Sequence, residues 1–175
     1  MYDINDFIPF EHKDLELKNN TINFARQQNT NELTGILAAT LIYANLVDYL
    51  AKSILENLRR MISIDSYKNF SAVFFYNSSK KRINLSLGEL KKELSNFCFP
   101  DKESFLQKIE KFNDKRNQVM HNLIEKNFNA EEFNKDLKEI ANLAEEILIK
   151  YNTISTGIST TWQAKYPLSM PGQTK

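Results

Sequence analysis

The chain has 175 residues, 42% of them hydrophobic, and its 23 basic and 22 acidic side chains leave a formal net charge of +1. That length fits one domain with a substantial core and is too short for two comfortable ones. The balanced charge argues against a general nucleic-acid coat protein or a polybasic membrane-binding protein, so any contact with RNA or DNA requires a local basic patch.

Residues that interrupt helices are rare. The chain has four glycines and four prolines, which favours long helices over a turn-rich β fold. The single Cys98 excludes an internal disulfide framework and fits a reducing compartment, so we expect a cytoplasmic protein. The first residues lack the basic and apolar segments of a signal peptide, and we expect no stretch that is long and apolar enough to span a membrane.

Residues 1–30 are predicted to form an irregular arm followed by a short helix over about 14–28. Helical spacing is much stronger from residue 31 to about 62, where apolar residues lie on more than one side of the helix. Such a helix is typical of the centre of a bundle or of a dimer interface. The region 63–85 is harder to interpret, because the apolar run 72–76 fits either a short strand or a buried helical turn.

Ser86 is the predicted N-cap of a short helix, with Glu89 three residues later completing a capping box. Residues 99–101 end that helix and begin another. The apolar side of this next helix is marked by Phe105, Ile109, Phe112, Val119, Met120 and Leu123. The last strong helix is predicted to begin near Asn129, with Glu132 at the box position and an apolar face at helical spacing.

The predicted fold is an all-α antiparallel bundle of four to five main helices, formed by a domain over residues 31–154. Residues 155–175 are rich in Ser, Thr, Gly and Pro and are predicted to form a flexible tail. Trp162 within this tail indicates that part of it can dock on the domain.

The helix expected after residue 101 contains the most informative pattern of the chain, Arg116-Asn117-Gln118-Val119-Met120-His121. Helical spacing puts Arg116 on the row that carries Phe112, and puts Asn113, Asn117 and His121 on a polar row beside it. A permanent cation, an amide and an imidazole suit metal-free chemistry on a phosphodiester. They can stabilise its charge, orient it and move a proton near neutral pH.

An arginine on an apolar row is costly unless it meets an anion or lies at an interface. The candidate anion is Asp48, which lies on the apolar row of the long helix, although Lys52 on the same helix is an alternative partner for it. Three lysines flank the motif and are candidate RNA-binding residues, with an ordinary solvated helix face as the other interpretation: Lys111, Lys115 and Lys126.

The Arg-Asn-x-x-x-His pattern, late in an all-helical domain, resembles the RNxxxH signature of HEPN domains. The long preceding helix with an embedded acid, the helix start at 86–90 and the helix after the motif resemble the HEPN layout over roughly residues 30–152. The resemblance implies a helical bundle that dimerises so that two motifs face each other. It also implies a metal-independent endoribonuclease without a cofactor, of the kind that acts as a toxin, an antiviral effector or an RNA-processing factor.

The same resemblance implies roles for the three residues. His121 would be the general acid or base when a 2′-hydroxyl attacks the adjacent phosphate, Arg116 would stabilise the phosphorane charge, and Asn117 would orient the phosphate or the imidazole. The products would be a 2′,3′-cyclic phosphate and a 5′-hydroxyl. Residues five apart on a helix point about 140° apart. A two-fold partner would therefore bring Arg116 and His121 from different chains onto one phosphate.

One departure concerns Leu123, which stands where toxins paired with nucleotidyltransferase antitoxins have a tyrosine. Regulation by modification at that position is therefore not supported. The leading interpretation is a homodimeric endoribonuclease of a toxin or antiviral defence system, with RNA as its substrate and a regulatory protein as a candidate partner. Two alternatives stay open. One is a catalytically silent HEPN-like module that binds a protein, a nucleotide or RNA, and the other is an unrelated bundle in which the motif is accidental.

Overall fold

The computed structural model describes residues 9–10, 15–70, 84–125 and 129–167, and these ranges contain helices and no strand. The five helices in chain order are α1 (Leu15–Arg26), α2 (Leu33–Phe70), α3 (Leu87–Ser95), α4 (Lys102–Glu125) and α5 (Ala130–Lys165). The predicted all-α bundle of four to five main helices is therefore confirmed. The 72–76 run, for which a strand or a helical turn was left open, lies outside the described residues.

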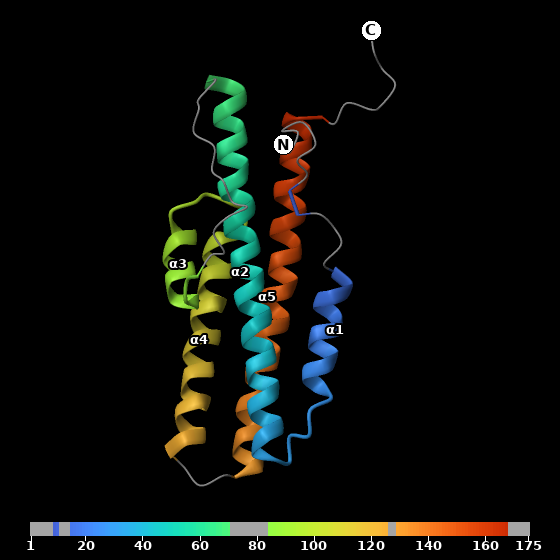
Figure 1. The fold of residues 1–175 in the computed structure, drawn as a ribbon, viewed down its shortest axis with the longest axis vertical. Coiled ribbons are helices and arrows are strands. Elements are labelled where there is room, and N and C mark those ends of the chain that lie inside the picture. Colours follow the sequence, from blue (N-terminus) through green and yellow to red (C-terminus); the bar gives the residue numbers. More distant parts are fainter. Residues whose placement is uncertain (1–8, 11–14, 71–83, 126–128, 168–175) are drawn as a thin grey trace.

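The two longest helices, α2 and α5, pack together and run in the same direction (Figure 1). Ser53 shares a hydrogen bond of 2.9 Å with Tyr151, and farther along both helices Asp65 accepts a hydrogen bond from Lys165. α1 packs on α2, and α4 packs on α5 in the opposite direction (Figure 1). The short α3 lies outside this layer, where it packs on both α2 and α4.

All five helices contribute to one hydrophobic core, to which α1 adds Ile22 and Ala25. The largest fully buried side chains are Phe105, Phe112, Phe133, Ile36, Leu50, Ile54, Leu55, Leu90, Leu94, Ile109, Ile140 and Ile147. They come from α2, α3, α4 and α5 and follow the helical spacing seen in the sequence. Burying a side chain of this size contributes about 1.5–3 kcal/mol, so these contacts are a major source of the stability of the bundle.

Side-chain caps fix the starts of α3 and α5. The backbone nitrogen of Ser86 donates to the Glu89 carboxylate at 2.7 Å, and the Ser86 hydroxyl accepts from the Glu89 backbone nitrogen at 3.4 Å. This reciprocal pair confirms the predicted capping box. The Asn129 side chain accepts from the backbone nitrogen of Glu131 at 3.1 Å, so the predicted start of α5 is also confirmed.

Two helices extend beyond their predicted ends. α2 continues past residue 62 to Phe70, and α5 continues to Lys165, so the flexible tail predicted from residue 155 was wrong over that stretch. The Ser and Thr residues there suggested a loop, yet the Thr161 hydroxyl donates to the Gly157 carbonyl at 2.9 Å and so remains satisfied within the helix. Trp162 is buried, as its presence in the tail indicated.

The segment Leu33–Ser66 of α2 is long and apolar enough to cross a membrane by length and composition, with a mean hydropathy of 1.5. The expectation that no segment has this character was therefore wrong. In this fold α2 contacts α1, α3, α4 and α5, and a helix covered on several sides needs the same composition. Only 44% of its most apolar stretch is buried, so part of this apolar surface is left uncovered.

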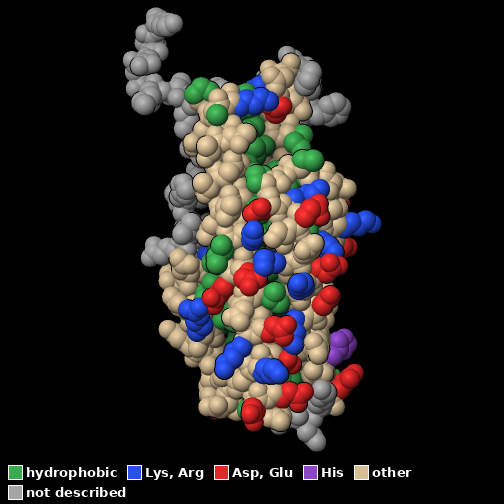
Figure 2. All heavy atoms as spheres, turned by 180° about the vertical axis from the view of Figure 1, so that it is seen from behind, with side chains coloured by type: hydrophobic (Ala, Val, Ile, Leu, Met, Phe, Trp, Pro, Cys, Tyr) green, Lys and Arg blue, Asp and Glu red, His purple; other side chains and the backbone are tan. Residues whose placement is uncertain are grey.

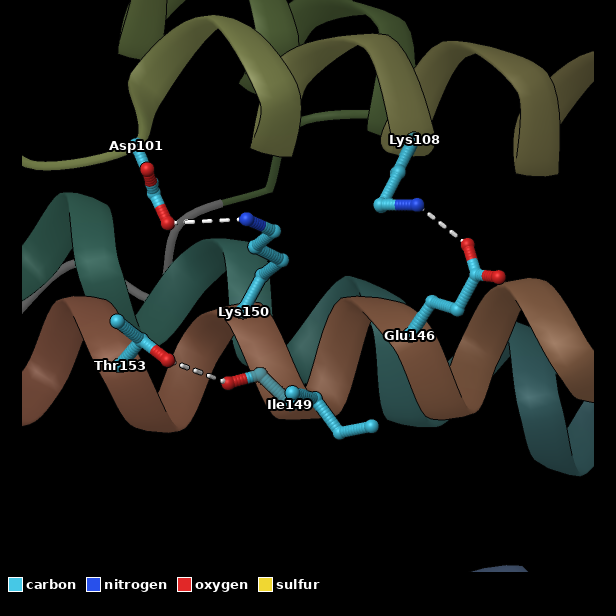
Figure 3. Close-up of polar contacts among 6 residues, drawn as sticks. All are labelled: Asp101, Lys108, Glu146, Ile149, Lys150 and Thr153. Atoms are coloured by element: carbon cyan, nitrogen blue, oxygen red, sulfur yellow. Dashed lines mark hydrogen bonds and ion pairs between the residues drawn. The ribbon is translucent and has the colours of Figure 1, made fainter.

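Ion pairs cross the seam between α4 and α5. Lys150 bonds Asp101 at 3.0 Å, and Lys108 bonds Glu146 (Figure 3). Basic and acidic side chains are interspersed over the side of the molecule opposite to that in Figure 1, so neither sign forms an extended patch there (Figure 2). Mixed charge of this kind gives little attraction for a polyanion.

Candidate functional site

The motif lies on the C-terminal half of α4, where the burial of the helix changes. Phe112 and Val119 are fully buried, whereas Arg116 is half-buried although it continues the predicted core-facing row. Asn117 and His121 are exposed, as expected for the polar row. Arg116 therefore lies at the edge of the core, where its aliphatic stem packs and its guanidinium reaches polar partners.

The Arg116 guanidinium is held by two amide oxygens from its own helix. Its Nη2 atom donates to Asn113 Oδ1 at 2.9 Å and to Asn117 Oδ1 at 2.9 Å. Its Nε atom donates to the same Asn117 oxygen at 3.3 Å. These bonds join the predicted apolar and polar rows into one group. They also show that the Asn117 oxygen is directed at Arg116.

Asp48 is paired elsewhere. Its carboxylate lies 2.6 Å from Lys52 Nζ, and no ion pair joins Asp48 to Arg116 in the described part of the chain. The proposed Asp48–Arg116 pair is thus not formed, and Asp48 instead pairs with the alternative partner on its own helix, Lys52. An i,i+4 pair of partly exposed side chains forms within one helix and needs no burial of either charge.

The flanking lysines differ in their availability. Lys115 Nζ bridges Asp136 at 2.8 Å and Glu139 at 2.6 Å on α5, and its side chain is only 16% exposed. Its hydrogen bonds to Asp136 and then to Glu139 raise its pKa above the usual value. Lys111 is exposed, whereas Lys126 lies outside the described residues. Of the two lysines described, only Lys111 is free to face an RNA backbone.

His121 is exposed, and the described residues provide it with no hydrogen bond or ion pair. Arg116 and His121 do not bond each other, which agrees with their expected angular divergence on one helix. Within one chain the structure therefore brings together Arg116, Asn117 and Asn113. His121 belongs to the same helix but not to this hydrogen-bonded group.

The position of α3 explains why the motif is accessible. Arg59 of α2 bonds Glu93 of α3 at 2.8 Å, and Lys91 of α3 bonds Glu110 of α4 at 2.5 Å. These pairs anchor α3 over the N-terminal half of α4, and in the described part of the chain no further helix packs outside α3 (Figure 1). α3 is only nine residues long and is held opposite Glu110, and Asn117 and His121, farther along α4, are exposed.

Helical geometry identifies the residues of α2 and α4 that point to the same side as α3 but lie beyond it. Leu41 lies about five turns before Arg59, so it points to the same side of α2, and it is 48% exposed. Asn117 lies about two turns after Glu110 on the corresponding side of α4. We call the surface that carries Leu41 and Asn117 the open face. Sequence reasoning missed this face, although the short predicted helix at 86–99 was a signal of it.

The open face places Asp48 and His121 at similar heights. Asp48 and His121 are equally far along their helices from the residues that anchor α3, at about 16 Å in each case. Helical geometry therefore puts His121, Asp48 and the exposed Leu41 on the same side of the bundle, in the region of Asn117. Such a region combines apolar surface with a held cation and an exposed imidazole. Those groups can bind an anion and transfer a proton.

Comparison with known proteins adds no assignment, because no family model, no curated protein and no solved structure matches the chain. The arguments on function accordingly rest on the residues of the motif and on their surroundings.

Proposed function

We propose that this protein is a HEPN-type endoribonuclease that cleaves RNA without a metal ion. The observation that carries the proposal is the Arg116–Asn117–His121 pattern at an accessible part of α4, with its cation held by neutral amides. Because Asn113 and Asn117 are uncharged, the positive charge of Arg116 remains available to a phosphate. The RNxxxH resemblance supplies the reaction class.

In the proposed reaction, His121 takes the proton of a 2′-hydroxyl while the oxygen of that hydroxyl forms a bond to the adjacent phosphorus. The bond from phosphorus to the 5′-oxygen breaks, and that oxygen takes a proton from water while His121 returns its proton to the solvent. The products are a 2′,3′-cyclic phosphate and a 5′-hydroxyl. A positioned general base typically raises the reaction rate about 10²–10⁴-fold. Arg116 stabilises the charge that develops on the phosphorane oxygens.

The complete site in this proposal is composite, formed by two copies of the chain across the open face. Arg116 and His121 diverge within one chain, and a two-fold axis brings one residue of each copy to a shared phosphate. Exposed apolar side chains flank the motif on this face, with Leu41 at 48% and Ile124 at 80% exposure. A second copy would cover them, which supplies a hydrophobic driving force for dimerisation.

We place the activity in a cytoplasmic toxin or antiviral defence system. The activity of a nuclease that needs no metal and no cofactor cannot be controlled by supplying or removing one. A regulatory protein that covers the open face is therefore the simplest way to inhibit it. The resemblance to HEPN effectors supports this setting. The same fold without catalysis, acting as a module that binds protein, nucleotide or RNA, is the alternative outcome of the test below.

The test compares wild type with His121→Ala on structured and unstructured RNA in excess chelator, followed by identification of the product ends. We expect wild type to leave 2′,3′-cyclic phosphates and the variant to lose activity. Gln118→Ala, an exposed change on the same helix, is the matched control and should cleave normally. Equal cleavage by His121→Ala would reject the proposal, and binding without cleavage by wild type would favour the silent module.

A further inference from the structure

The guanidinium of Arg116 has an unusual set of partners, because every acceptor that the structure gives it is a neutral amide oxygen from α4. We propose that Asn113 is a positioning residue that, together with Asn117, fixes Arg116 so that its Nη1 amino group faces the phosphodiester. We call these three residues the amide clamp. This inference rests on the proposed function and deepens it, since the RNxxxH pattern does not include position 113.

The hydrogen-bond donors of Arg116 divide into two groups. A guanidinium has five N–H donors. The Nε hydrogen and the Nη2 amino group are engaged by Asn117 and Asn113. The Nη1 amino group has no partner among the described residues, so its two hydrogens are available to a ligand. The clamp therefore restricts rotation of the side chain and leaves one edge open, which lowers the entropy lost when an anion binds.

The chemistry of the clamp matters as much as its geometry. A carboxylate at position 113 would accept the same hydrogen bond and would also neutralise the cation, as Asp136 and Glu139 do for Lys115. An amide accepts without contributing a charge. The clamp thus keeps Arg116 both oriented and fully cationic at the edge of the open face, which suits a group that stabilises developing negative charge.

Asn113 is also suitably placed for this role. Its bond to Arg116 is partly buried, whereas the Asn117 bonds are exposed. A hydrogen bond shielded from water is stronger and more persistent than an exposed one. Asn113 therefore contributes the more rigid half of the clamp. Asn117 contributes the half that can exchange its bond for a contact with the substrate.

Cleavage kinetics in excess chelator provide the first test. Asn113→Ala removes one neutral hydrogen bond, and we expect kcat to fall about three- to tenfold with little change in KM. Asn113→Asp retains the acceptor but adds a charge, and we expect kcat to fall more than about tenfold, because the ion pair weakens charge stabilisation. Gln118→Glu adds the same charge elsewhere on α4 and should change kcat by less than about threefold, as expected for a surface charge.

A spectroscopic test does not depend on cleavage. The Arg116 Nε–H signal, assigned by its loss in Arg116→Lys, is followed by NMR while a 2′-O-methyl RNA oligonucleotide that cannot be cleaved is added. We expect a shift of this signal in wild type, a broader signal and a smaller shift in Asn113→Ala, and no shift in Asn113→Asp.

The two tests separate the clamp from the nuclease activity. Normal cleavage by both Asn113 variants, together with an unchanged Arg116 signal, would overturn the role of Asn113 while the proposed function stands. Absence of cleavage by wild type, together with the expected shifts, would remove the nuclease and retain the clamp as an anion-binding device.

Discussion

Two consecutive cations on α4, Lys115 and Arg116, face different surroundings. Lys115 points into the seam with α5 and is bonded to two carboxylates, Asp136 and Glu139. Arg116 emerges beyond α3 and is bonded to two amides, Asn113 and Asn117. Carboxylates cancel the charge of a cation and hold helices together, whereas amides orient a cation and preserve its charge. The comparison therefore separates a cation that serves stability from one that is available for function.

The largest expected effect is the loss of activity in Arg116→Ala. Without the cation the negative charge of the phosphorane is not stabilised, and we expect kcat to fall about 10²–10³-fold. The melting temperature should stay close to that of wild type. Arg60→Ala, an exposed arginine of α2, is the control and should cleave as wild type does. A cooperative loss of structure in Arg116→Ala would contradict the comparison, because Arg116 would then be a structural residue.

Lys115→Ala should show the opposite pattern, with lower stability and unchanged activity per folded molecule. The substitution leaves Asp136, whose side chain is 15% exposed, without its cation, and we expect a loss of about 1–3 kcal/mol in unfolding free energy. Denaturant titration measures it. Lys111→Ala, one turn earlier and exposed, should change stability by less than about 0.5 kcal/mol. An inactive but stable Lys115→Ala would break the comparison.

Leu41→Glu tests whether a second copy covers the open face. A carboxylate within an apolar contact must be desolvated, and we expect the dimer dissociation constant to rise at least about tenfold. Ile149→Glu places the same charge on an apolar residue of α5 that is 64% exposed, and it should leave association unchanged. Sedimentation at micromolar concentration that shows only monomer in wild type would contradict the composite site.

The smallest expected effect is the contribution of Lys115 to the pH dependence of stability. The pKa of Lys115 is raised by Asp136 and then by Glu139, so its pKa in the folded chain lies above its unfolded value. The resulting stabilisation is complete below about pH 10 and is lost as the pH rises through the folded pKa. The free energies of unfolding of wild type and Lys115→Met, measured at intervals of roughly one pH unit between about pH 9 and 12, should converge as the pH rises. Parallel curves would contradict it.

The sequence predicted the helices and their caps better than the features that depend on tertiary contacts. Capping residues and apolar spacing are local signals, and for this reason Ser86, Asn129 and the buried face of α4 were correctly predicted. The end of α5 was missed, because Ser and Thr residues favour loops by composition while their hydroxyls can bond back to the helix. Local composition does not reveal which of these outcomes the tertiary contacts select.

The candidate site shows the same division. The positions of Arg116, Asn117 and His121 on one helix could be predicted from spacing, and so could the two rows. The partner of Asp48 and the fate of Lys115 could not, because several oppositely charged residues are within reach and the choice depends on how the helices pack. The open face depends on the length of α3 relative to its neighbours, which is a property of the assembled bundle.

The parallel arrangement of α2 and α5 has a practical consequence for labelling the protein. Asp65 accepts hydrogen bonds from Lys165 and Tyr166, which holds the end of α5 on α2. This end lies far from the motif, because α5 begins near the end of α4 and rises about 50 Å along its axis. A fluorophore or surface anchor attached at the end of α5 would therefore leave the open face accessible to a second copy and to RNA.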